Sequence, residues 1–374
     1  MKTLQLRDLY DRFRDPATIK GLAALIAEDA KRLREPLHIM EVCGGHTHTI
    51  MKYGLNQLLP ENIEFVHGPG CPVCIMPKER IDNAVELANI DGVILCTLGD
   101  MIRVPGSGSS LANERAKGRD IRSLYSPLDL IEIAKSNPEK RVVYFAIGFE
   151  TTTPMTAAVI KRAVKEGVKN LFFHINHVLV PPPMHILMAD EEAKIDAFIG
   201  PAHVSVITGS KIYEPFPEKY STPVVVSGFE PVDVMHSIAM IVKQKIEGRA
   251  EVEVQYSRSV SREGNVAAQR MIEETMEVRE SFRWRGIGDI EKSALRLRDE
   301  YRDFDAEAVF ADYLSHEPID DHKLCICGTI LKGLAKPYEC RVFGKACTPN
   351  TPLGSCMVSS EGACNAYYRF GGVS

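Results

Sequence analysis

The sequence predicts an α/β protein with two similar parallel-sheet lobes, followed by a helical region that ends in a cysteine-rich tail. Short runs rich in Val and Ile alternate with segments of helical periodicity, which is the pattern of parallel sheets. These runs are short and mostly continuous, as expected of strands buried on both faces. After residue 320 the chain has too few apolar residues for a core of its own, so we expect a bound metal group to hold it.

The length of 374 residues favours more than one domain. We expect N-terminal helices at 1–36 that pack on the C-terminal region, a first lobe at 37–140, a second lobe at 141–254 and a helical region with the tail at 255–374. The predicted strands span 37–42, 62–67, 92–98, 141–147, 169–175, 195–199 and 223–227. Helical spacing is found in "KERIDNAVELANI", "TAAVIKRAVKEG", "SREGNVAAQRMIEETMEV" and "IEKSALRLRDEYRDFDAEAVFADYL".

Two similar segments indicate an internal duplication. "GPGCPVCI" (68–75) and "GPAHVSVI" (200–207) share Gly-Pro and the final isoleucine at an offset of 132 residues. Predicted strands that start at 37, 62 and 92 recur at 169, 195 and 223, close to the same offset. On this alignment, His203 of the second lobe is the counterpart of Cys71 of the first.

Composition narrows the class of protein. The net charge is −5, so no basic surface for nucleic acid is expected. The N-terminus "MKTLQLRDLYDRFRDP" reads as an amphipathic helix and lacks the apolar segment of a secretory signal. The longest apolar stretch, "LFFHINHVLVPPPMHILMA", is broken by three prolines and does not predict a membrane span. We therefore expect a cytoplasmic protein, in which ten cysteines favour metal binding or redox chemistry over stable disulfides.

The tail carries six cysteines within the last 50 residues, spaced C-x-C-x12-C-x6-C-x8-C-x7-C. It lacks the paired C-x2–4-C elements of zinc sites. Irregularly spaced cysteines in a Gly-rich loop suit an iron–sulfur cluster, and a [4Fe–4S] cluster needs four, which leaves two for a redox pair. A zinc knot or purely structural cysteines are the alternatives. We expect only one of Cys325 and Cys327 to be a ligand.

A second cysteine motif, "HGPGCPVCIMPKER", places Cys71 and Cys74 before a predicted helix that starts near Pro77. A helix N-terminus favours thiolate, and no second C-x2-C is present to complete a zinc ribbon. A redox or metal-ligand pair is therefore favoured over a structural one.

The stretch "EVCGGHTHTI" places Cys43, His46 and His48 in a polar turn after a buried strand. A cysteine beside histidines can act as a nucleophile, because imidazole can take the thiol proton, or as a soft metal ligand. The alternative is a buried cysteine beside turn glycines. Cys96, in the middle of "VILCTLGD", is expected to be a core residue.

Further polar side chains follow predicted strands. Because sites in open parallel sheets lie beyond the carboxyl ends of strands, we expect several of these side chains to meet in a cleft between the lobes. Each alone is more often a capping or loop residue. The candidates are Asp100, Glu150, His174, His177, His203 and Glu230.

The motifs "CGGHTH", "GPGCPVC", "GFETT", "PAHVSVI" and "CTPNTPLGSCMVSSEGACNAYY" resemble, in order and over nearly the whole chain, the HypD family of hydrogenase maturation factors. The resemblance implies a scaffold that works with a small HypC-type chaperone and a HypE-type cyanide donor to assemble the Fe(CN)2CO part of [NiFe]-hydrogenases. It also implies two α/β lobes with a [4Fe–4S] region. Whether such a scaffold is also an enzyme, with thiol or electron-transfer activity, stays open.

The same resemblance implies roles for the cysteines. Cys43 would be a thiolate ligand of the iron under assembly, tuned or deprotonated by His46 and His48. Cys71 and Cys74 would ligate that iron or pass electrons to it, in a chain similar to ferredoxin–thioredoxin reductase. The implied cluster ligands are Cys325, Cys340, Cys347 and Cys364, with Cys327 and Cys356 as a spare redox pair.

Two other functions fit the motifs less completely. A stand-alone iron–sulfur thiol–disulfide reductase would use the cluster with Cys71 and Cys74, but it has no need of Cys43 and its histidines. A zinc-stabilised interaction protein would contain zinc and no sulfide.

Overall fold

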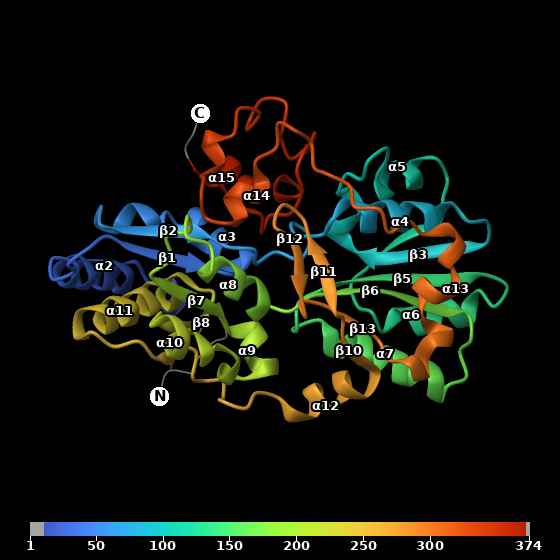
Figure 1. Ribbon diagram of the computed structural model, residues 1–374, viewed down its shortest axis with the longest axis horizontal. Helices are drawn as coiled ribbons and strands as arrows, with labels where there is room; N and C mark the ends of the chain where they lie inside the picture. Colours follow the sequence, from blue (N-terminus) through green and yellow to red (C-terminus); the bar gives the residue numbers. More distant parts are fainter. Residues whose placement is uncertain (1–10, 372–374) are drawn as a thin grey trace.

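The computed structural model describes residues 11–371, so residues 1–10 of the predicted first helix lie outside the described part. Two parallel sheets with flanking helices lie side by side, and the cysteine-rich C-terminal region lies across their junction (Figure 1). The strands are β1 (Leu37–Glu41), β2 (Ile63–His67), β3 (Val93–Leu98), β4 (Ile121–Leu124), β5 (Arg141–Gly148), β6 (Leu171–His177), β7 (Ala197–Pro201), β8 (Val224–Ser227), β9 (Val252–Val254), β10 (Met276–Val278), β11 (Ser281–Trp284), β12 (Gly288–Glu291) and β13 (Leu295–Leu297). The helices are α2 (Pro16–Ala30), α3 (Gly44–Lys52), α4 (Lys78–Asn89), α5 (Leu111–Ala116), α6 (Asp129–Ser136), α7 (Thr153–Lys165), α8 (Pro181–Met188), α9 (Ala202–Thr208), α10 (Pro215–Tyr220), α11 (Pro231–Glu247), α12 (Val266–Thr275), α13 (Ala306–Val309), α14 (Cys327–Leu331) and α15 (Ala363–Phe370).

The two sheets have related strand orders. The first is β2-β1-β7-β8-β9 and the second is β4-β3-β5-β6, and all of these pairs are parallel. All seven predicted strands are present within two residues of their predicted starts, because each carries an apolar run that both faces of a sheet can bury. The short edge strands β4 and β9 were not predicted, since "IRSL" and "VEV" lack such a run.

The predicted boundary between the lobes is wrong. β1 and β2 form a sheet with β7 to β9, whereas β3 to β6 form the other sheet across the predicted division at residue 140. The chain therefore leaves the first sheet after β2, builds the second with β3 to β6 and returns to the first at β7. Strands that are neighbours in sequence need not share a sheet, and apolar runs alone do not say which strands pair.

The duplication also has a different alignment. In each sheet, the second strand along the chain lies at an edge, beside the first. By this order, β1, β2, β7 and β8 of the first sheet correspond to β3, β4, β5 and β6 of the second. Cys71 and His203 both follow strands of the first sheet, so they are not counterparts in separate lobes. The two residues share one sheet edge instead.

The N-terminal helix α2 packs on α11 of the first lobe. We had expected it to pack on the C-terminal region, which is not its main contact. Asp15 caps its start by accepting a hydrogen bond from the Thr18 amide at 2.8 Å, and Pro16 fits the first turn. Ile19 and Ile26 belong to the same buried apolar cluster as Ile238 of α11. This packing covers one face of the first sheet.

Residues 276–297 form two small antiparallel pairs, β10 with β13 and β11 with β12, where the second half was predicted to be helical. Phe282 and Trp284 alternate with outward-facing neighbours, which is strand periodicity. Gly286, Gly288 and Lys292 adopt positive φ angles of 74°, 108° and 52°, which a helix cannot contain. The helical spacing of 290–314 is therefore realised only in short turns and in α13.

The C-terminal region has no separate core. Cys327 of α14, Cys356 and Cys364 of α15 belong to one buried cluster with Val66 of the first sheet and Phe145 of the second. The region is thus held by the surfaces of both lobes. Within residues 11–371, none of the helices is both long and apolar enough to cross a membrane.

Candidate functional site

A cleft of about 480 Å³ lies where loops after strands of both sheets meet the C-terminal region. Its walls come from the loops after β2, β3 and β5, from His203 after β7, and from residues 359–361. The arrows of β1 and β3 point toward one another at the junction of the two lobes (Figure 1). A site in an open parallel sheet is expected beyond the carboxyl ends of its strands, and here both sheets contribute such ends to one cleft.

Cys43 lies between β1 and the first turn of α3 and is only 2% exposed. The backbones around it are packed closely at two glycines. A Cβ on Gly44 would lie 2.2 Å from the Glu361 carbonyl oxygen, and a Cβ on Gly70 would lie 2.2 Å from the Cys43 nitrogen. The glycines of "CGGH" and "GPGC" therefore let three chain segments converge on the thiol.

The histidine nearest to Cys43 is His203, whose Nε2 lies 3.6 Å from the Cys43 sulfur. Burial raises the pKa of the Cys43 thiol, and the nearby Glu361 carboxylate raises it further. Burial also lowers the pKa of His203 to about 4. At neutral pH the pair is therefore a neutral thiol beside a neutral imidazole, and burial outweighs the influence of the α3 N-terminus.

His46 and His48 contact other groups. His46 Nε2 donates to the Gly228 carbonyl at 3.0 Å, and burial lowers its pKa to about 4. The His48 Nδ1 lies 3.3 Å from the Ser360 carbonyl oxygen. Through these bonds, the two histidines hold α3 against the loop after β8 and against the C-terminal region.

Phe229 stacks between two histidine rings. Its centroid lies 4.5 Å from that of His46 and 4.8 Å from that of His203, with interplanar angles of 20° and 24°. The ring therefore fixes the face of His203 while its Nε2 points at Cys43. Phe229 was not predicted as a site residue, although its neighbour Glu230 was. An aromatic residue after a strand does not by itself indicate a functional site.

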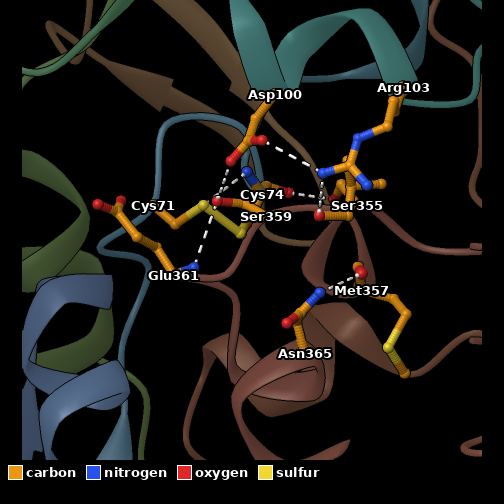
Figure 2. The surroundings of a disulfide bond; sticks show 10 residues. Cys71, Cys74, Asp100, Arg103, Ser355, Met357, Ser359, Glu361 and Asn365 are labelled. Carbon is orange, nitrogen blue, oxygen red and sulfur yellow. Dashed lines mark hydrogen bonds and ion pairs between the residues drawn. A yellow bond between two sulfur atoms is a disulfide. The ribbon is translucent and has the colours of Figure 1, made fainter. Parts of the chain in front are cut away.

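Cys71 and Cys74 are joined by a disulfide, with their Cα atoms 5.2 Å apart. Figure 2 shows the C-terminal loop 355–361 packed directly against this disulfide loop. Ser355 Oγ donates to the Cys74 carbonyl at 2.5 Å. The sequence places these two segments 281 residues apart, so nothing in either motif reveals the contact.

Two further bonds fasten the same loop to the turn after β3. Ser359 Oγ donates to Asp100 at 3.0 Å, and Arg103 donates to the Val358 carbonyl at 3.1 Å (Figure 2). Asp100 lines the cleft as predicted, together with Glu361. Burial raises the pKa of Glu361, and the nearby Asp100 carboxylate adds to this effect.

The remaining cleft candidates are separated by the fold. Glu150 is buried behind the cleft wall, where one oxygen accepts from the Val180 amide at 2.9 Å, the other has no partner and burial raises its pKa to about 7. His177 contacts Thr156 at 2.8 Å, inside the second lobe. His174 is fully buried beside Asn176 and stacks on Phe145, and Glu230 pairs with Arg14. None of these four lines the cleft.

A buried polar network behind Cys43 was also missed. Glu41 accepts from Thr47 Oγ1 at 2.5 Å, and its same oxygen lies 2.5 Å from His67 Nδ1. The other ring nitrogen of His67 lies 3.0 Å from the Tyr367 hydroxyl of α15. Burial raises the pKa of Glu41. The network ties the end of β1 to the helix that carries Cys364.

Two of the six tail cysteines, Cys325 and Cys327, lie against Gly354. A Cβ there would lie 2.5 and 2.6 Å from the sulfurs of Cys325 and Cys327, so this position must lack a side chain. The neighbouring Cys327 thiol raises the pKa of both Cys325 and Cys364, and burial adds to this effect. Cys356 is fully buried, and Cys340 is half-buried beside the Leu324 carbonyl at 3.8 Å.

This donor set fits an iron–sulfur cluster. Its donors are sulfurs, which iron–sulfur clusters take as thiolates, and Gly354 leaves the space in front of them open. Among residues 11–371, no group of three His, Cys, Asp or Glu side chains is arranged so that it could hold a single metal ion. Cys327, expected to be spare, lies closer to Cys325 and Cys364 than the predicted ligand set implies.

Comparisons with known proteins agree over nearly the whole chain. The family model described as "HypD: Hydrogenase formation hypA family" matches residues 17–371. The chain is 52% identical over 367 residues to the hydrogenase maturation factor HypD of Azotobacter vinelandii, covering 96% of each chain. It is 44% identical over 364 residues to HypD of Escherichia coli K12, covering 96% of this chain and 97% of that protein. The chain therefore belongs to the HypD family of hydrogenase maturation factors.

Proposed function

We propose that this protein is the scaffold on which the Fe(CN)2CO group of [NiFe]-hydrogenases is assembled, with Cys43 as the ligand of the incoming iron. The observation that carries the proposal is the placement of a buried thiol, 3.6 Å from an imidazole, beside a cleft that a disulfide loop and two carboxylates also line. A soft thiolate in a site shielded from water suits iron with strong-field ligands.

Binding of the iron must release the thiol proton. Because burial raises the pKa of Cys43, the thiol stays protonated until a cation arrives. Neutral His203 presents the free lone pair of Nε2 to the sulfur and lines the cleft, so it can relay this proton to solvent as the metal–sulfur bond forms. Phe229 keeps the imidazole in place during the transfer. His46 and His48 position α3 from behind.

The partners complete the site. A HypC-type chaperone would cover the cleft and supply a second cysteine ligand, and a HypE-type protein would deliver cyanide to the iron. The cleft is open on one side and measures about 480 Å³, which leaves room for a small metal complex and a short partner segment. The similarity to hydrogenase maturation factors supports this assignment.

The tail would hold a [4Fe–4S] cluster through Cys325, Cys340, Cys347 and Cys364, with Cys327 and Cys356 as the spare pair. When bound, the cluster supplies single electrons. The chain itself supplies the Cys71–Cys74 disulfide, which takes up two electrons and two protons to give two thiols. These thiols then lie at the cleft, where they can ligate or reduce the iron.

The disulfide also favours a second candidate, a stand-alone thiol–disulfide reductase. In that case the disulfide would exchange with an external substrate. Cys71 is only 3% exposed and Cys74 is fully buried, so an external disulfide cannot reach either sulfur without movement of the loop. We therefore rank this function second.

Complementation tests the proposed function. A host that lacks its own copy is supplied with wild-type protein, Cys43→Ala or Cys96→Ala, and hydrogenase activity is measured. Cys96 is a fully buried strand thiol outside the cleft, which makes it a matched control for loss of a buried sulfur. We expect activity to vanish only in Cys43→Ala, with cluster iron and sulfide retained. Normal maturation in Cys43→Ala would refute the scaffold.

A further inference from the structure

The C-terminal loop touches the disulfide loop through one side-chain hydrogen bond. Ser355 lies in a short turn, Ser355–Met357, immediately before Cys356. Its hydroxyl is fully buried and donates to the Cys74 carbonyl at 2.5 Å (Figure 2). Loss of this hydroxyl would leave the buried Cys74 carbonyl without its partner, which costs free energy.

The backbone behind Ser355 leads straight to the tail cysteines. Cys356 follows it in the chain, and the Cys356 carbonyl packs on Gly362, where a Cβ would lie 2.1 Å away. Gly362 begins the turn into α15, which carries Cys364. Cys356 and Cys364 are close enough for their charges to interact. The tail cysteines and the disulfide are thus joined by a few covalent bonds and a single hydrogen bond.

Ser359 offers a contrast within the same loop. It is also buried, at 3% exposure, and it also donates through Oγ, but its acceptor is Asp100 of the second lobe and not the disulfide loop. The two serines therefore secure the same loop to different parts of the protein.

We propose that Ser355 is a positioning residue for electron transfer, whose hydroxyl bridges the cysteine-rich region to the Cys71–Cys74 disulfide. This inference rests on the proposed function. A one-electron donor, such as a reduced iron–sulfur protein, delivers two electrons in turn to the cysteine-rich region. Both cross the Ser355–Cys74 bond, the S–S bond breaks, and two protons from solvent complete the two thiols.

The test follows the two stages separately in protein that carries its full iron and sulfide. Reduced methyl viologen is mixed with wild-type protein, Ser355→Ala or Ser359→Ala without oxygen. Bleaching of the cluster absorbance reports the first stage. Thiols at Cys71 and Cys74, trapped by alkylation and counted by mass spectrometry, report the second.

In Ser355→Ala we expect the first stage at the wild-type rate and the second slowed about tenfold, the rate equivalent of one hydrogen bond. Ser359→Ala loosens the same loop but leaves the Ser355–Cys74 bond in place, so we expect it to slow the second stage less than Ser355→Ala does. Thiol formation at the wild-type rate in Ser355→Ala would overturn the proposal. Equal slowing in both variants would also overturn it, because the effect would then belong to loop seating in general.

If Ser355→Ala does not fold, Ser355→Thr and Ser355→Val replace it, since these variants share one shape and differ in the hydroxyl. Only the valine variant should be slow, and equal rates would overturn the proposal. The proposed function has its own readout, the infrared bands of the bound iron complex. Bands in wild type together with a fast Ser355→Ala would remove only this inference, whereas absent bands would remove the scaffold. A wild-type disulfide that stays oxidised after the cluster is reduced would overturn the electron route itself.

Discussion

The Cys43 sulfur and His203 Nε2 lie 3.6 Å apart although 160 residues separate them in the chain. The contact arises because β1 and β7 are paired in one sheet, so the residues that follow them emerge at the same edge. This places an imidazole, fixed by Phe229, at the thiol that the scaffold account assigns to iron.

His203→Gln should weaken binding of Fe²⁺ to the apoprotein by about tenfold or more, as is typical when a residue that supports a metal ligand is removed. The reason is loss of the proton acceptor beside Cys43. Anaerobic titration with Fe²⁺ measures the affinity. His177→Gln is the control, because it alters a buried histidine that contacts Thr156 and does not line the cleft. Equal affinities for the two variants would exclude a role of His203 at the iron.

Cys340→Ser and Cys327→Ser separate the two ligand sets. The predicted ligands include Cys340, whereas the structure places Cys327 against Cys325 and Cys364. We expect Cys340→Ser to lose most of its iron and acid-labile sulfide and Cys327→Ser to retain them, with both measured on protein purified without oxygen. The reverse result would show that Cys327, and not Cys340, completes the ligand set.

Glu150 makes stability depend on pH. Burial raises its pKa from 4.5 to about 7, so the folded state holds a proton that the unfolded chain releases above pH 4.5. Its contribution is fully present below pH 4.5 and is lost as pH rises through about 7, a change of roughly 3 kcal/mol at about 1.4 kcal/mol per pKa unit. Denaturant unfolding of wild type and Glu150→Gln from pH 4.5 to 8 measures it. The variant should gain stability relative to wild type as pH rises, and parallel curves would refute the assignment.

Gly44→Ala should detach the C-terminal region from Cys43. The new Cβ would lie 2.2 Å from the Glu361 carbonyl, so backbone must move, at a typical cost of about 1–3 kcal/mol. Gly21→Ala is the control, because that helical glycine has open space around it, and the change should stabilise α2 by about 0.5–1 kcal/mol. Thermal unfolding gives both values. A neutral Gly44→Ala would show that the contact with Glu361 is not needed.

Sequence reasoning identified the strands and the ends at which polar residues gather, because an apolar run and its boundary are local properties. Asp100 and His203 line the cleft for this reason, and so does the loop that carries the Cys71–Cys74 disulfide. It could not identify the exchange of strands between lobes, since pairing of β1 with β7 depends on contacts far apart in sequence. It therefore assigned His46 to the thiol, although the fold turns that ring toward Gly228 and brings in His203.

Glu361 and Ser355 were missed for the same physical reason. Both lie among the tail cysteines, whose spacing carries the strongest sequence signal of this region. Their roles come from contacts with loops about 280 to 320 residues away in the chain. Conversely, Glu230 and His174 were predicted from their positions near strand ends but do not line the cleft. Glu230 forms an ion pair with Arg14, and His174 is buried inside the second lobe.

The most direct test of the central claim is an infrared spectrum of the protein purified without oxygen together with its small partner. The account predicts bands in the cyanide and carbonyl stretching regions for wild type and for Cys96→Ala, and their loss in Cys43→Ala at unchanged cluster content. Absence of these bands from wild-type protein that carries a full cluster would contradict the scaffold, and bands that persist in Cys43→Ala would contradict the assignment of Cys43 as the iron ligand.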